Sequence, residues 1–292
     1  FQVALDSLLS AGFPFVSWRT LNARAFGLPQ ARRRLFLVAS RDRDRALALH
    51  ARTPPLDRDA SVQSSVHGFY WTGGTRSICY SRGFVPALKI GSTDNKGRSP
   101  VAVLIDNHIR KLTPLEYLGL QGFKSLPIED LPASTVLRMA GNAVPAPVGR
   151  FVMDSIASCA ASAGTRTGFG IVSPSGMYDG RMLWTIEHEP VPLAVNLCDF
   201  LDLALRDSLS SQAAAGLIVR SIRSGHSMHV ELLDALLELA GQRGRLKPSR
   251  GDSFAALDSL RGDLNAYRAA QARFTDHPAI DYVNGDRVGR QS

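Results

Sequence analysis

The pattern of apolar and polar positions predicts a mixed α/β protein. Apolar residues at near-helical spacing predict a helix over residues 2–11, ended by Gly12. Loose alternation predicts a strand over 13–21, and the apolar run Leu35–Ala39 predicts a second, buried strand after a Gly-Leu-Pro turn. These pieces belong to an α/β sheet, but they are too few for a complete nucleotide-binding domain.

The middle of the chain changes character. Residues 41–65 are charged and then rich in Pro and Ser, which indicates a connector. Residues 66–104 carry aromatic and β-branched residues interrupted by Gly-Gly, Pro and Asp-Asn. That composition predicts short strands and turns in a small, mostly β lobe.

Helices follow this lobe. Thr113, a following Pro and Glu116 have the spacing of a capping box, which predicts a helix that ends at Gly122. Further helices are expected over 132–140 and 147–161, joined by a tight turn at 141–145.

The remainder of the chain predicts a linker and a helical tail. Strongly helical patterns cover 196–242, with Ser208, Ser210 and Ser227 as candidate caps, and one more amphipathic helix covers 252–273. We interpret the tail as a compact helical unit, although Arg220, Arg223 and His226 form a face that could also touch DNA.

Charge is distributed unevenly. The 292 residues carry a net charge of +8, yet the first 113 residues hold 17 basic and 7 acidic side chains and the rest hold 17 and 19. A basic field in one region is the expected footprint of a polyanion site, and a merely soluble basic surface is the alternative. Three scattered cysteines argue against a disulfide framework and fit a reducing cytoplasm. No metal-ligand spacing, signal peptide or long apolar stretch is present.

Residues 30–34 place unusual polar groups before an apolar strand. Gln30, Arg32 and Arg34 alternate, so an extended backbone puts them on one face. Two guanidiniums and an amide suit a phosphate or a polar base edge. The alternative is an exposed basic strand end that pairs with carboxylates elsewhere.

The predicted β lobe mixes aromatic residues with cations, a combination that suits nucleic acid. The residues that could contact DNA are Tyr70, Trp71, Arg76, Lys89 and Ser92. Phe69 and Tyr80 are better explained as the core of a small lobe.

Three segments, in this order, resemble one family. They are NARAFGLPQARRR (22–34), RKLTPLEYLGLQGF (110–123) and GNAVPAPV (141–148), and they resemble blocks of the C5-cytosine DNA methyltransferases. Lys124 stands where that family usually has proline. FYWTGG and VPALKIGST also look like a target-recognition segment from one bacterial branch. The likeness covers roughly residues 15–150, and the helical tail matches much more weakly.

The resemblance implies a chemistry and a set of roles. Such enzymes flip a cytosine out of double-stranded DNA, and a cysteine thiolate attacks C6 so that C5 takes a methyl group from S-adenosyl-L-methionine. By resemblance, Arg34 contacts the cytosine O2, Arg32 supports the pocket and Gln30 shapes it. Gly141, Asn142 and Ala143 would close over the cofactor. The block that contains Thr113 would brace the recognition lobe against the catalytic lobe.

The family's cofactor loop, Pro-Cys nucleophile and Glu-Asn-Val segment have no counterpart in this sequence. None of Cys79, Cys159 and Cys198 follows a proline, and none precedes Arg34. Because the chain begins with Phe1, we expect an upstream segment to carry these parts, in one polypeptide with this chain. A separate subunit of a split enzyme and a DNA-binding module without catalysis are the alternatives.

The expected fold class is α/β. It comprises the C-terminal part of a Rossmann-like S-adenosylmethionine-dependent methyltransferase domain, a small mostly-β recognition lobe and a helical tail. The protein would be cytoplasmic and encoded by a bacterium or phage, with a role in restriction-modification or other DNA modification. The expected divisions are catalytic domain (1–40), recognition lobe (41–108), return to the catalytic domain (109–163), linker (164–195), helical tail (196–275) and a disordered end (276–292).

Overall fold

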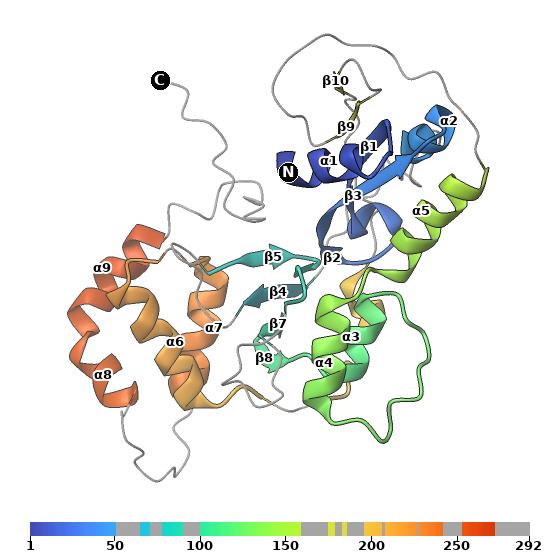
Figure 1. Ribbon diagram of the computed structural model, residues 1–292. Coiled ribbons are helices and arrows are strands. Elements are labelled where there is room, and N and C mark those ends of the chain that lie inside the picture. The colour runs from blue at the N-terminus through green and yellow to red at the C-terminus, as the bar shows by residue number, and fades with distance from the viewer. Residues whose placement is uncertain are drawn as a thin grey trace, which may run out of the picture.

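The computed structural model shows two small four-stranded sheets, with helices around them (Figure 1). The mixture of helices and sheets agrees with the α/β class expected from the sequence, while the Rossmann-like arrangement stays a prediction. The structure describes residues 1–50, 65–70, 78–89, 100–158, 175–178, 183–185, 196–205, 208–226, 228–241 and 253–271.

The first sheet has the strand order β10-β9-β1-β3, and all its neighbouring strands are antiparallel. Its strands are β1 (Phe15–Asn22), β3 (Arg33–Ser40), β9 (Ser175–Tyr178) and β10 (Leu183–Thr185). Short helical segments accompany it: α1 (Gln2–Ser10), η1 (Ala23–Phe26), α2 (Arg43–Ala46) and η2 (Leu47–His50). Strands β9 and β10 lie inside the range 164–195 predicted as a linker, where the sequence had indicated no strand.

One face of this sheet is held by α2 and η2. The hydroxyl of Ser17 donates to the carbonyl of Ala46, and a guanidinium nitrogen of Arg19 donates to the carbonyl of Leu49 at 2.7 Å. The prediction of a strand at Leu35–Ala39 is confirmed, but the prediction that it is buried is wrong. Leu35 is 44% exposed and Leu37 is 37% exposed. The physical reason is that, among the described residues, β3 pairs with β1 alone and lies at the sheet edge.

The second sheet has the order β5-β4-β7-β8 and is also antiparallel. Its strands are β4 (Val66–Tyr70), β5 (Tyr80–Arg82), β7 (Val101–Ile105) and β8 (His108–Lys111). A short parallel pair, β2 (Gln30–Ala31) with β6 (Val85–Pro86), joins the two regions. Gly68 is required beside β6, because a Cβ there would come within 2.6 Å of the carbonyl of Phe84.

Both faces of the second sheet are covered by helices (Figure 1). On β7, Val101 and Val103 pack toward α3 (Pro114–Leu120) and α4 (Ala133–Asn142). Alternate residues Ala102 and Leu104 pack toward the C-terminal helices. Those helices are α6 (Ser211–Arg223), α7 (Val230–Gly241), α8 (Ser253–Ser259) and α9 (Arg261–Gln271).

Two remaining elements connect the regions. Helix α5 (Ala146–Ser158) packs Val148 and Phe151 against η1, where the rings of Phe26 and Phe151 meet edge to face at 5.2 Å. The turn η4 (Leu197–Phe200) buries Leu197 against α3 and α4. Among the described residues, no helix has the length and apolarity needed to cross a membrane.

Helix caps follow the sequence closely. The capping box is confirmed: the hydroxyl of Thr113 accepts from the backbone N–H of Glu116, and the Glu116 carboxylate accepts from the backbone N–H of Thr113. The side chain of Ser210 caps α6 by accepting from the N–H of Ala213. Ser227, another candidate cap, lies outside the described residues.

Candidate functional site

Gln30 is a buried connector between three parts of the chain. Its side chain is fully buried, and its amide nitrogen donates to the carbonyl of Leu120 at 2.8 Å. Its amide oxygen accepts from the backbone N–H of Leu88 at 3.1 Å. One side chain therefore joins the arginine segment to the end of α3 and to the segment after β6.

Arg32 makes the same kind of connection with three backbone carbonyls. Its guanidinium donates to Leu88 at 2.7 Å and to Gly141 and Ala143 at 2.8 Å each. The side chain is 2% exposed. Burial, and next the charge of Arg34, lower the pKa of Arg32 to about 10. Arg32 is thus still charged at neutral pH, and its charge is directed at carbonyl dipoles rather than at solvent.

Arg34 has a different environment although it follows Arg32 by two residues. It is exposed, and its guanidinium donates to the neighbouring carbonyl of Arg33 at 3.1 Å. The alternation predicted for Gln30, Arg32 and Arg34 therefore leads from two buried anchors to one exposed cation. Arg34 is the member of the three that a ligand in solvent can reach.

In the predicted recognition lobe, Tyr70 and Lys89 lie together. The Tyr70 hydroxyl donates to the carbonyl of Ala87, and the Lys89 ammonium lies 4.5 Å from the centre of the Tyr70 ring. The Lys89 carbonyl accepts from the hydroxyl of Tyr117 at 3.1 Å. Burial raises the pKa of Tyr70, so the phenol keeps its proton and stays a donor.

Lys89 is exposed, and it follows Leu88, whose carbonyl is held by Arg32. The other residues predicted to contact DNA are Trp71, Arg76 and Ser92, and they lie outside the described residues.

The three residues predicted to contact the cofactor lie at the end of α4. The structure corrects the expected tight turn at 141–145, because α4 continues through Asn142 and the turn begins at Ala143. The backbone N–H of Ala143 still bonds to the carbonyl of Met139, which holds the extra helical residues. Gly141 is buried and Asn142 is exposed, so the amide of Asn142 is available to a polar group of a ligand.

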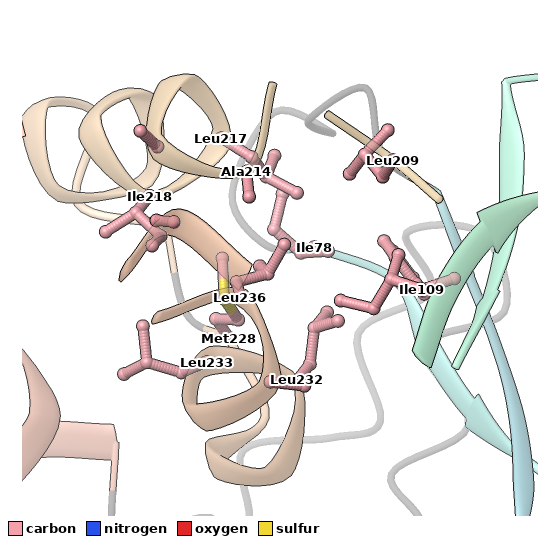
Figure 2. Close-up of a cluster of buried hydrophobic side chains, with 14 of the residues drawn as sticks. Ile78, Ile109, Leu209, Ala214, Leu217, Ile218, Met228, Leu232, Leu233 and Leu236 are labelled. Carbon is pink, nitrogen blue, oxygen red and sulfur yellow. The ribbon is translucent and has the colours of Figure 1, made fainter. Parts of the chain in front are cut away.

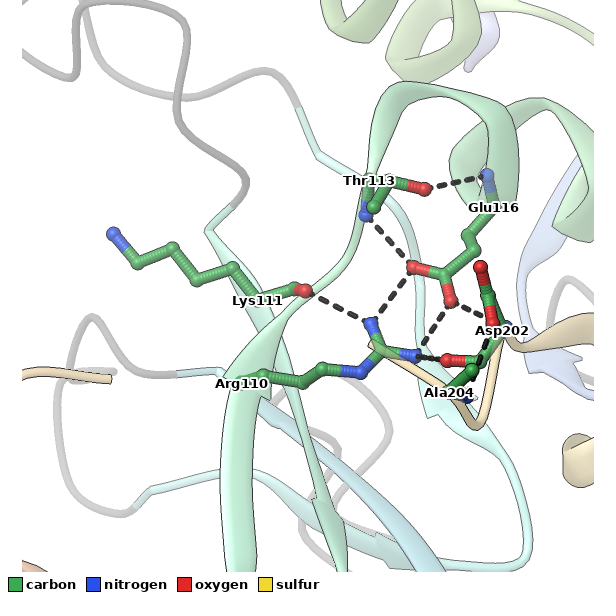
Figure 3. A network of polar contacts seen from close by, with 6 residues as sticks. All are labelled: Arg110, Lys111, Thr113, Glu116, Asp202 and Ala204. Carbon is green, nitrogen blue, oxygen red and sulfur yellow. Dashed lines mark hydrogen bonds and ion pairs between the residues drawn. The ribbon is translucent and has the colours of Figure 1, made fainter. Parts of the chain in front are cut away.

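A buried ion pair braces the predicted recognition lobe (Figure 3). The guanidinium of Arg110 forms two bonds with the carboxylate of Glu116, at 2.6 and 2.9 Å. The carboxylate also accepts from the backbone N–H of Asp202 at 2.9 Å, and Arg110 donates to the Asp202 carbonyl at 3.0 Å. Sequence reasoning missed this network, although a cation and a carboxylate six residues apart around a strand-to-helix turn could have indicated it.

The cysteines lie apart from this arrangement where they are described. Cys198 packs in η4 against the core of α3 and α4, and the Cys79 carbonyl accepts from the N–H of Tyr70. Both side chains are half-buried, and Cys159 lies outside the described residues. Among described residues, no group of three or more His, Cys, Asp or Glu could hold a metal ion.

The geometry brings three separate sequence segments to one point. Buried Gln30 and Arg32 fix the backbone of Leu88 and of the end of α4. Three polar side chains beside those anchors are exposed: Arg34, Lys89 and Asn142. Cations and an amide around a fixed frame can bind an anionic or strongly polar ligand.

Comparisons with known proteins agree with this chemistry. Residues 1–67 match the family described as C-5 cytosine-specific DNA methylase. Type II methyltransferase M2.BsuMI of Bacillus subtilis is 33% identical over 167 residues, which cover 52% of this chain and 42% of that protein. Type II methyltransferase M.NgoBI of Neisseria gonorrhoeae is 31% identical over 170 residues, covering 51% and 52%.

A third relative, type II methyltransferase M.HaeII of Haemophilus aegyptius, is 29% identical over 190 residues, which cover 53% of this chain and 54% of that protein. The chain thus spans about half the length of the curated relatives it matches. No solved structure matches significantly.

Proposed function

We propose that this chain forms part of a DNA (cytosine-5-)-methyltransferase, because residues 1–67 match the C-5 cytosine-specific DNA methylase family and about half of the chain is similar to type II methyltransferases. The enzyme transfers a methyl group from S-adenosyl-L-methionine to C5 of a cytosine flipped out of a specific DNA sequence. Its biological setting is restriction-modification, which the type II names of the relatives support, or phage and host DNA modification.

The observation that carries this proposal is the convergence on Arg32. Its three bonds to carbonyls join the arginine segment, the recognition lobe and the end of α4. Two of these segments, 22–34 and 141–148, resemble family blocks, and Leu88 lies in VPALKIGST, which looks like a target-recognition segment. A merely basic surface would not need a buried guanidinium at the junction of all three, because surface arginines are satisfied by water.

The exposed residues then take separate roles. Arg34 donates hydrogen bonds to the flipped cytosine, where a guanidinium stabilises negative charge that develops on the base. Tyr70, Trp71, Arg76, Lys89 and Ser92 contact the DNA around the target. Arg32 and Gln30 act as positioning residues, since every bond described for them goes to backbone.

The end of α4 fits a contact with S-adenosyl-L-methionine. The carbonyls of Gly141 and Ala143 are turned to Arg32, and Asn142 between them is exposed. Asn142 would hold a polar group of the cofactor, which supplies the methyl group. The buried bonds on either side fix the backbone of Asn142, so that this backbone need not be ordered when the cofactor binds.

The nucleophile and most of the cofactor site are proposed to come from residues outside these 292, because no cysteine here follows a proline. The exposed Leu35 and Leu37 on the edge strand β3 are the surface to which that catalytic part would attach. A subunit of a split enzyme is the alternative arrangement, and a DNA-binding module without catalysis is the alternative function.

A methyl-transfer assay tests the proposal. The 292-residue chain is incubated with DNA and labelled S-adenosyl-L-methionine, alone and with a polypeptide that carries the Pro-Cys and Glu-Asn-Val segments. We expect no transfer from the chain alone and transfer on addition of the second polypeptide. The control is that polypeptide with its Pro-Cys cysteine replaced by alanine, which should restore nothing.

Two outcomes would contradict the proposal. Transfer by the chain alone would refute the external nucleophile. DNA binding without transfer in any combination would favour the non-catalytic module.

A further inference from the structure

A polar cluster joins the recognition lobe to the tail. The carboxylate of Glu231 on α7 accepts a hydrogen bond from the Tyr80 hydroxyl at 2.7 Å and forms an ion pair with Arg82 at 2.7 Å. Tyr80 and Arg82 are the first and last residues of β5. One carboxylate therefore holds both ends of this strand.

Aromatic stacking reinforces the cluster. The ring of His229 stacks on the ring of Tyr80, with centres 4.5 Å apart and planes 13° apart. A guanidinium nitrogen of Arg82 lies 3.3 Å from Nε2 of His229. The centre of the His67 ring, on β4, lies 5.4 Å from the centre of the Tyr80 ring. Backbone bonds join β4 to β5, and these side chains connect the two strands to α7 and to His229 just before it.

Beneath this cluster, the lobe and the tail share one apolar core (Figure 2). Ile78 and Ile109 from the lobe pack among Leu217, Leu232 and Leu236 of α6 and α7. A backbone bond from the N–H of Leu209 to the carbonyl of Ile109, at 2.8 Å, fixes the chain just before α6. The tail is therefore not an independent unit attached by a linker.

We propose that α6 and α7 are part of the target-recognition lobe and that Glu231 is a positioning residue for DNA sequence recognition. This inference rests on the proposed function and extends it to a region that the family resemblance barely covers.

The physical reason lies in the weakness of β5. It is three residues long, and among the described residues it is an edge strand paired with β4. Its register is set by three residue pairs, so few backbone bonds resist a slip. The chain between β4 and β5 contains Trp71 and Arg76, which are predicted to contact DNA. A carboxylate that holds Tyr80 and Arg82 fixes where that connection returns to the sheet.

The test measures sequence preference directly. The 292-residue chain and its variants each select from a library of randomised DNA duplexes, and the bound duplexes are sequenced. We expect Glu231→Ala to lower the ratio of preferred to random sequence binding about tenfold, while binding to random duplexes stays the same.

The matched control is Asp234→Ala, on the same helix. Asp234 pairs with Arg268 of α9 at 2.7 Å, and its side chain is 45% exposed, as is that of Glu231. The ion pair described for Asp234 is with α9 and not with β5, so its loss should leave the ratio unchanged. Thermal melts of both variants check that the fold survives, and Glu231→Gln, which keeps the acceptor for Tyr80, serves if the alanine variant does not fold.

A double-mutant cycle measures the coupling between Glu231 and Arg82 in sequence preference, which general destabilisation would not produce. If Glu231 acts through Arg82, the combined Arg82→Ala and Glu231→Ala variant should lose no more preference than either single variant. Equal preference in the Glu231 and Asp234 variants, or additive losses in the cycle, would overturn the positioning role. No sequence preference in the unaltered chain would refute the proposed function and this inference together.

Discussion

Strands β3 and β7, one from each four-stranded sheet, bury their apolar residues to different extents. On β7 of the second sheet, Val103 and Leu104 point to opposite faces and are 0% and 3% exposed, because helices cover both sides. On β3 of the first sheet, Leu35 and Leu37 are 44% and 37% exposed. Both strands contain a run of five apolar residues, 35–39 on β3 and 101–105 on β7, so the difference lies in what covers them.

This comparison indicates which region is complete in itself. In the second sheet, α3 and α4 cover one face and α6 and α7 cover the other, so the apolar side chains of both faces are buried. In the first sheet, Leu35 and Leu37 are exposed on the edge strand β3, a surface that another polypeptide can cover. We therefore propose that the second sheet forms the recognition lobe and that the first sheet belongs to a larger domain.

The largest effect on stability should come from loss of the Arg110–Glu116 ion pair beside the second sheet. Glu116→Ala leaves the Arg110 guanidinium buried without its carboxylate and also removes the acceptor for the N–H of Asp202. We expect a loss of about 3–5 kcal/mol in the free energy of unfolding, measured by urea titration. Asp234→Ala, which breaks an exposed ion pair, should cost below about 1 kcal/mol. Equal losses from the two substitutions would contradict the burial of the Arg110–Glu116 ion pair.

Apolar truncations test the two sheets directly. Leu236→Ala in the shared core of lobe and tail should cost about 2–5 kcal/mol, because it removes a fully buried side chain and leaves a cavity. Leu37→Ala should cost below about 1 kcal/mol in this chain, since little of its contact is lost. Urea unfolding followed by circular dichroism measures both. A large loss of unfolding free energy from Leu37→Ala would contradict the exposure of this face of β3.

Substitution of Leu37 should have a large effect on association with the proposed catalytic part, although its effect on stability should be small. Leu37→Asp places a charge on the proposed interface and should weaken binding of a polypeptide with the Pro-Cys segment by about tenfold or more, without lowering the melting temperature of this chain. Sedimentation or fluorescence anisotropy gives the affinity. Leu203→Asp is the control, because Leu203 is also exposed, at 46%, but follows η4 near the second sheet. Equal weakening by both variants would argue against a specific interface at β3.

The smallest expected effect is a pH dependence of the contact between lobe and tail. Burial lowers the pKa of His67 and of His229 below 6.5, so the folded chain favours both rings neutral. For Glu231, burial raises the pKa, but the Tyr80 hydrogen bond and the charge of Arg82 outweigh it, and the net pKa is lowered. The groups that face His229 are His67, Tyr80, Arg82 and Glu231.

These lowered pKa values determine how stability changes with pH. The stabilisation from the histidines is complete above pH 6.5 and is lost as the pH falls through their folded-state values, and that of Glu231 is lost at still lower pH. The melting temperature should therefore drop between about pH 7.5 and about pH 5.5. His229→Gln should reduce that drop, and an unchanged drop would assign it to other groups.

Local chemistry made much of this fold predictable from the sequence. Thr113 and Glu116 carry a capping box whose bonds span three residues, so neighbours in sequence determine it. The Gly-Leu-Pro turn similarly separates β1 from β3. The extra helical residues Gly141 and Asn142 were missed, because a bond from Ala143 to Met139 and the guanidinium of Arg32 hold them.

Long-range burial was harder to predict. The run of apolar residues on β7 could have indicated a strand covered on both faces, but the sequence did not indicate that the tail supplies one cover. Likewise, Arg32 and Arg34 are identical in type and alternate on one strand-like stretch. Their separation into a buried anchor and an exposed cation depends on carbonyls 56 and 109 residues away from Arg32.

The shared core also determines an order of events during synthesis. Strand β8 ends at Lys111, but the helix α7 that completes the cover of the sheet ends at Gly241. At about 5–20 residues per second, the ribosome needs roughly 7–26 s to make the intervening residues. During that interval one apolar face of the sheet, with Phe69 and Leu104, has no partner to fold onto. We therefore expect the nascent chain to need a chaperone until its last helices emerge, and a ribosome stalled before α7 to yield an aggregating product.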